Sequence, residues 1–172
     1  MTNNRDTVRL DPALAEALNE HVSVEAKSAF QYHAMASWAE VRGLTGTAAW
    51  LRGEAEGEMS HMLQFVDHLN DRGYQATFHA MPVPKSEWSD LAAMFEQVVE
   101  MERNLCRQID NLIDTAHTQR DHFTSSFLQG FVPQQISDMA EADEILDRIR
   151  IAGSDGHATI LIDQELRGRS GK

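Results

Sequence analysis

The chain has 172 residues, a formal net charge of −12 and one cysteine, Cys106. This length suits a single domain with one core, and so negative a charge argues against nucleic acid or an anionic membrane as the main partner. A single cysteine forms no intramolecular disulfide and suits a reducing compartment. Residues 1–6 are polar, unlike a signal peptide, and no stretch is apolar enough to cross a bilayer. We therefore expect a cytoplasmic protein with no membrane partner.

Apolar residues recur at helical spacing along most of the sequence, and strand signals are almost absent. Asp11 followed by Pro12 is typical of a helix start, and Gly43 and Gly73 mark breaks after the first two helices. Pro133 could bend the fourth helix, because proline removes one backbone hydrogen bond. We predict one domain over residues 1–172, with helices at about 11–41, 43–72, 89–117, 121–152 and 157–167.

The lengths of the connections predict the topology. Short turns make the first and second helices antiparallel, and likewise the third and fourth. The middle connection has about 15 residues and can reach about 50 Å, whereas a helix of about 29 residues is only about 43 Å long. The third helix can therefore run parallel to the second. This connectivity predicts an all-α, ferritin-like four-helix bundle with one long crossover connection and a short fifth C-terminal helix.

Each long helix carries an apolar stripe that is interrupted near its middle by acidic or amide groups. The interruptions are Glu25, Glu58 and Glu102 on the first three helices, and Gln135 with Asp138 on the fourth. The midpoints of similar helices meet at one level, so several carboxylates would share a dry interior, which is costly for ionised groups. They could take up protons, pair with bases or bind cations. No lysine or arginine lies on the stripes near this level, so we expect cations.

The segment Glu58-x-x-His61 places an oxygen and a nitrogen ligand one turn apart on one helix face. The di-iron template of helical bundles uses a glutamate from each of two helices and Glu-x-x-His from each of the other two. Glu25 and Glu102 fit the two single-glutamate positions, and Glu58 with His61 supplies one of the two Glu-x-x-His segments. The fourth helix does not supply the other segment, because it has Gln135 and Asp138 at this spacing. We predict a strong and a weak metal position. The predicted metal ligands are Glu25, Glu58, His61, Glu102, Gln135 and Asp138.

Several motifs together resemble the bacterial non-haem ferritins, over about residues 10–166. They are Leu18-Asn19-Glu20, Glu25, Tyr32, Glu58-Met59-Ser60-His61, Glu102, Phe127-Leu128-Gln129, Gln135 and Ile162-Asp163-Gln164-Glu165-Leu166. The resemblance implies a ferroxidase that oxidises Fe(II) with oxygen or peroxide at a non-haem di-iron site. It also implies that the ferric mineral is stored in a homo-oligomeric shell of twenty-four subunits.

The resemblance further implies a role for individual residues. The first iron would lie on Glu25, Glu58 and His61, and Glu58 would bridge to a second iron near Glu102, with Gln135 close by. Tyr32 matches a tyrosine that lies beside the site of family members and can supply an electron. The alternative for this tyrosine is a core residue whose hydroxyl bonds to Glu102.

The sequence also departs from the family. Acidic residues that build a third iron position in many members are replaced by Gly57, Gln134 and Ser137, although Asp138 could partly substitute. Near the turn before the fourth helix, Asp121 matches an acidic residue of the iron entry route, but Thr124 stands where a second acid is frequent. We therefore expect the third position to be lost and this entry route to be weakened.

Three other interpretations stay open. The chain could be a passive or mixed-shell storage subunit with weakened oxidation, a haem-binding bacterioferritin that uses Met59, or a helical interaction bundle without metal. The fourth helix lacks the Glu-x-x-His segment of the haem-binding group, which argues against haem. His21 lies on the inner stripe, and we expect a hydrogen-bonded core histidine rather than a metal ligand.

Overall fold

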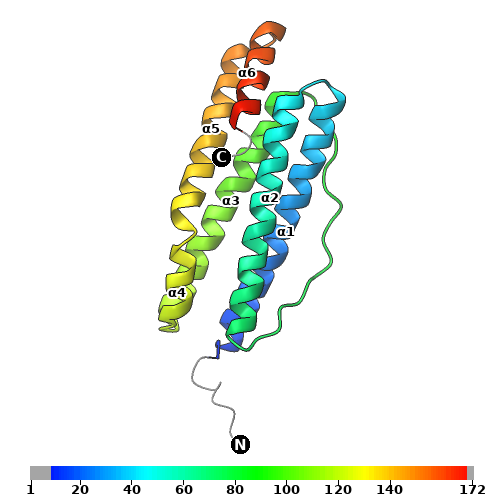
Figure 1. Cartoon of the computed structure of the whole chain (residues 1–172). Coiled ribbons are helices and arrows are strands. Elements are labelled where there is room, and N and C mark those ends of the chain that lie inside the picture. Colours follow the sequence, from blue (N-terminus) through cyan, green and yellow to red (C-terminus); the bar gives the residue numbers. More distant parts are fainter. Residues whose placement is uncertain (1–8, 170–172) are drawn as a thin grey trace, which may run out of the picture.

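The computed structural model describes residues 9–169, and this part of the chain contains helices and no strand. No helix among these residues is long and apolar enough to cross a membrane. Figure 1 shows long helices packed side by side, which confirms the all-α bundle. The helices are α1 (Pro12–Val41), α2 (Thr45–Asp71), α3 (Leu91–Thr118), α4 (His122–Gln129), α5 (Val132–Ala152) and α6 (Gly156–Arg169).

The first two helices form an antiparallel pair whose ends follow local chemistry. The side chain of Asp11 accepts a hydrogen bond from the backbone N–H of Ala13 at 2.9 Å and so caps α1, with Pro12 in the first turn. Between α1 and α2, Gly43 has a φ of +78°. Glycine adopts this left-handed conformation without the steric penalty of a Cβ, which allows the tight reversal.

The connection between α2 and α3 runs along the outside of α1 (Figure 1). Two side chains of α1 hold it there through paired hydrogen bonds. Asn19 bonds the backbone N–H of Thr77 at 2.7 Å, and Gln31 bonds both the N–H and the carbonyl of Lys85 at 3.0 and 2.8 Å. Asn19 and Gln31 lie about 18 Å apart along the helix axis at the usual rise per residue. The connection therefore crosses the bundle, and α3 starts at the end where α2 starts, which confirms the predicted crossover.

The predicted helix 121–152 is wrong as a single element, because the chain breaks between α4 and α5. At the break, the N–H groups of Gly130 and Phe131 bond to carbonyls only three residues back. Pro133 has no N–H to continue the α-helical pattern across this point and lies in the first turn of α5, where proline is tolerated. Gln135 consequently lies near the start of a helix rather than in the middle of one.

Helix α6 packs against the N-terminal end of α2. Leu44 provides no side-chain cap there, and the Asp163 carboxylate of α6 accepts hydrogen bonds from the N–H groups of Gly46 and Thr47 at 3.0 and 2.7 Å. An added Cβ on Gly46 would lie 1.8 Å from the Asp163 carbonyl oxygen. Glycine is therefore required for this close approach, which places the end of α6 beside α2 and α5 (Figure 1).

The buried apolar residues form two clusters rather than one. One cluster includes Tyr32, Leu51 and Phe95, and the other includes Leu14 and Phe65. Glu58 on α2 and Glu102 on α3 fall between residues of the two clusters, and Glu25 on α1 lies close to the border of the second cluster. The bundle thus has a polar layer between two apolar halves, and this layer contains the candidate site.

Candidate metal centre

Three of the predicted ligands converge in the polar layer. Glu25 of α1 and Glu58 and His61 of α2 each offer a ligand atom, and these atoms all lie within 4.8 Å of one another. Glu25 is 0% exposed and Glu58 is 5% exposed. The Nδ1 atom of His61 lies 3.1 Å from Oε2 of Glu58. Two carboxylates with one imidazole are a suitable donor set for a divalent transition metal such as Fe(II).

The electrostatics of this group suit a cation. Burial raises the pKa of Glu25 to about 7 and that of Glu58 to about 8. Burial by itself would lower the pKa of His61, but the hydrogen bond to Glu58 and the charge of Glu25 raise it. Without a cation, the interior therefore disfavours the ionised carboxylates, and a dication would reverse that preference.

Unpaired carboxylate oxygens point to the same conclusion. Among the described residues, Oε2 of Glu25 and Oε2 of Glu102 are buried without a hydrogen-bond partner. A buried acceptor without a partner costs free energy, because it loses its water and gains nothing in return. Metal ions bound in this layer would satisfy such oxygens, so the residues present fit bound cations.

Glu102 of α3 lies in the same layer and bonds to Tyr32. The hydroxyl of Tyr32 donates a hydrogen bond to Oε1 of Glu102, and both side chains are buried. Burial raises the pKa of Glu102 to about 8, with a further contribution from the charge of Glu58. Burial and the charge of Glu102 also keep the pKa of Tyr32 above its usual range. Tyr32 therefore contacts a predicted iron ligand directly, as the core-residue interpretation expects, and this position beside the site is also compatible with the supply of an electron.

Of the two predicted ligands of the fourth helix, Asp138 does not join the three-residue group among the described residues. Gln135 is buried, its Oε1 atom lies 3.8 Å from the Cys106 sulfur, and its Nε2 atom has no partner in the described part of the chain. Asp138 accepts a hydrogen bond from Nε2 of Gln134 at 2.7 Å. Their role as ligands stays a prediction.

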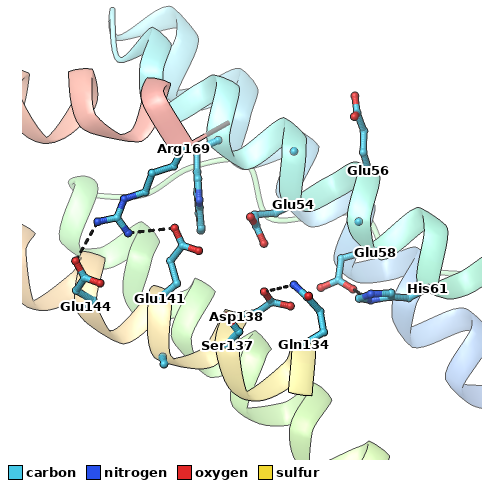
Figure 2. Close-up of a pocket in the computed structure, with 14 residues that line it drawn as sticks. Glu54, Glu56, Glu58, His61, Gln134, Ser137, Asp138, Glu141, Glu144 and Arg169 are labelled. Atoms are coloured by element: carbon cyan, nitrogen blue, oxygen red, sulfur yellow. Dashed lines mark hydrogen bonds and ion pairs between the residues drawn. The ribbon is translucent and has the colours of Figure 1, made fainter. Parts of the chain in front are cut away.

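A cavity of about 770 Å³ opens between α2 and α5 and reaches Glu58 and His61. In Figure 2 the carboxylates of Glu54, Glu58 and Asp138 point into the same hollow. Burial raises the pKa of Glu54 to about 8, and the charge of Asp138 is the next largest cause of this increase. At one end of the cavity, Arg169 of α6 forms ion pairs with glutamates of α5 (Figure 2).

Sequence reasoning did not find Glu54 and misjudged the surroundings of His21. As expected, His21 is buried and hydrogen-bonded, but its Nε2 atom lies 2.8 Å from Oε1 of Glu25. The available signal was the spacing of four residues, which places His21 one turn before Glu25 and Glu54 one turn before Glu58. Both residues are thus neighbours of predicted ligands on the same helix face.

Asp121, which matches an acidic residue of the family's iron entry route, forms an ion pair with Arg72. Arg72 bonds both carboxylate oxygens of Asp121 at 2.7 and 3.1 Å. Burial would raise the pKa of Asp121, but the hydrogen bonds from Arg72 lower it. Thr124, where a second acid is frequent in the family, is buried and bonds to Arg72 and His68. Asp121 and Thr124 are therefore already engaged in hydrogen bonds with Arg72 and His68.

Comparisons with known proteins agree with the fold. Residues 15–152 match the ferritin-like domain family. A bacterial non-haem ferritin of Escherichia coli O157:H7 is 32% identical over 157 residues, which cover 91% of this chain and 95% of the relative. That of Staphylococcus saprophyticus is 33% identical and covers 94% and 96%. The open pore ferritin from Archaeoglobus fulgidus is 34% identical, has a TM-score of 0.90, and the match covers 92% of this chain and 98% of that chain.

Proposed function

The chain belongs to the ferritin family, and on that premise we propose that it oxidises Fe(II) at an intra-subunit di-iron site and stores the ferric mineral. The observation that carries the proposal is the convergence of Glu25, Glu58 and His61 within 4.8 Å. The unpaired buried oxygens of Glu25 and Glu102 support it independently, because a buried acceptor without a partner is costly and a bound cation would remove that cost.

In this proposal the first Fe(II) binds Glu25, Glu58 and His61. Glu58 bridges to a second Fe(II), which Glu102 binds through the oxygen that Tyr32 leaves unbonded. Each Fe(II) gives one electron to oxygen, and with two protons one oxygen molecule becomes hydrogen peroxide. With peroxide as the oxidant, two electrons and two protons yield two waters. The protein holds the two reductants close together, which removes the entropic cost of a termolecular encounter.

The second position is the weaker one. Gln135 is neutral, and an amide stabilises a cation less than a carboxylate does. Asp138 is hydrogen-bonded to Gln134 and, as the shorter carboxylate, would bind the iron through a water. Glu58 and Glu102 then hold the second ion with open coordination positions, where the oxidant can bind.

The cavity between α2 and α5 offers a path to the site. It opens to Glu58 and His61 and is lined by further carboxylates, including Glu54 and Asp138. Negative charge raises the local concentration of cations. Asp121 is already paired with Arg72, so we infer that iron exchanges with the site mainly through this cavity.

We propose that the chain works as a cytoplasmic homo-oligomeric shell of twenty-four subunits. Several large apolar side chains are exposed on the single chain, which suits burial between subunits. They include Val41, Phe78, Val83, Phe123 and Ile151. The related proteins with the same fold are ferritins. An interaction bundle need not form such a shell, so the mass in solution separates the two interpretations.

Weakened oxidation is the second candidate function. It is favoured by one observation: in the described part of the chain, Glu25, Glu58 and His61 form one group, and the predicted acidic ligands Glu102 and Asp138 do not belong to it. An anaerobic Fe(II) soak of crystals, with anomalous scattering at the iron edge, tests the proposal. Iron at Glu25, Glu58 and His61, with a second peak near Glu102, is the expected result. Iron bound only at the surface would refute the ferroxidase site and leave passive storage.

A further inference from the structure

His21 makes two hydrogen bonds inside the bundle. Its Nε2 atom lies 2.8 Å from Oε1 of Glu25, and its Nδ1 atom lies 3.3 Å from Oε1 of Gln108 on α3. The residue is 2% exposed, and its ring packs on Phe65 with the centroids 4.5 Å apart. The imidazole is thus held by a hydrogen bond at each ring nitrogen and by a tilted aromatic contact with Phe65.

The two oxygens of Glu25 have different surroundings. Oε1 bonds to His21, whereas Oε2 is buried without a partner in the described part of the chain. A carboxylate that binds a metal can use one or both oxygens. The hydrogen bond from His21 occupies Oε1 and leaves Oε2 for the cation.

We propose that His21 is a positioning residue that makes Glu25 a one-oxygen ligand, with Oε2 on the iron and Oε1 on the imidazole. This inference rests on the proposed function, because it needs a cation at Glu25. It assigns His21 no contact with the iron itself. Such hydrogen bonds to metal-binding carboxylates fix their orientation and raise the affinity of the site.

The hydrogen-bond chemistry has a consequence for Gln108. A carboxylate that binds a metal only accepts hydrogen bonds, so the N–H of a neutral His21 must lie on Nε2. The Nδ1 atom is then an acceptor, and Gln108 must turn its amide NH₂ group towards it. A one-oxygen Glu25 also keeps the coordination number low, which leaves room on the first iron.

The test uses Co(II) and Zn(II) as anaerobic probes of the assembled metal-free shell. His21→Leu removes the donor, so Glu25 is free to bind with both oxygens, the coordination number rises, and the visible absorption of bound Co(II) weakens. The Zn(II) affinity measured by calorimetry should fall on the order of 10- to 100-fold. His21→Gln keeps a donor one turn before Glu25 and should restore most of both signals.

Two controls separate the possible results. His68→Leu removes a different histidine, which is partly buried, bonds Thr124 and stacks on Phe127, and should change neither signal. Glu25→Ala should abolish binding at the first position.

Unchanged affinity and spectrum in His21→Leu, together with loss of binding in Glu25→Ala, would overturn the role of His21 and leave the proposed function intact. Unchanged binding in both variants would refute the proposed function. A crystal structure with Zn(II) bound through both oxygens of Glu25 would also overturn the inference.

Discussion

Replacing Glu25 by glutamine should stabilise the metal-free protein at neutral pH. Burial raises the pKa of Glu25 from an ordinary 4.5 to about 7. Because the folded-state value is the higher one, the unfolded chain loses its proton first, and stability falls as the pH rises from about 4.5 to about 7. At pH 7 the two values correspond to a cost of about 3 kcal/mol. Since Glu25 is coupled to Glu58, we expect a gain of roughly 1–3 kcal/mol from the substitution.

Calorimetric melting in the presence of a chelator measures this effect. For a chain of this length, about 1 kcal/mol shifts the Tm by about 2–4 °C, so Glu25→Gln should raise the Tm by several degrees at pH 7. Near pH 4.5 and below, the difference should disappear, because both states then hold the proton. Glu20→Gln, an exposed carboxylate on the same helix, is the matched control and should leave the Tm nearly unchanged.

Zn(II) should reverse the order of the Tm values, so that the wild type melts above Glu25→Gln. Zn(II) binds the folded wild type and should raise its Tm, whereas Glu25→Gln should respond weakly because it lacks a charged ligand. A variant that melts below the wild type at pH 7 without metal would refute the reasoning. A stability difference that does not depend on pH would refute it equally.

The remaining predictions concern iron and haem. Changing His61 to alanine should abolish the rapid phase of oxidation at about two Fe(II) per subunit in stopped-flow absorbance, and an unchanged rapid phase would contradict the assignment of the first position. Gln135→Glu should tighten the second position and slow turnover, because the ferric product leaves less readily; unchanged turnover would count against the weak second site. The protein expressed with haem precursor should show no Soret band, whereas about one haem per two chains would place it with the bacterioferritins.

The sequence predicted the fold because its signals are local. Asp11 with Pro12 starts α1, and Gly43 allows the turn into α2, as the structure confirms. The break before α5 was misjudged as a bend, since Pro133 stops a helix as readily as it starts one. The paired hydrogen bonds of Gln31 to the crossover depend on residues 54 positions apart, and no periodic pattern could predict them.

The candidate site was partly predictable for the same reason. Glu25, Glu58 and His61 converge because the middles of α1 and α2 meet at one level, which follows from helix length alone. The position of Gln135 was harder to predict, because the helix break changes how α5 approaches α3. The pattern of inward stripes did not predict the contact between His21 and Glu25, since it identifies His21 only as a core residue.

The distribution of positive charge explains why the carboxylates of the site favour a bound cation. At one end of the bundle Arg72 pairs with Asp121, and at the far end of the cavity Arg169 pairs with Glu141 and Glu144. Within the described range 9–169, Arg169 is the only lysine or arginine that lines the cavity. Glu54 and Glu58 lie between these two ends, with pKa values raised first by burial and then, for Glu54, by the neighbouring acids. Their charge is balanced by a proton or by a metal, and Fe(II) supplies two charges at once.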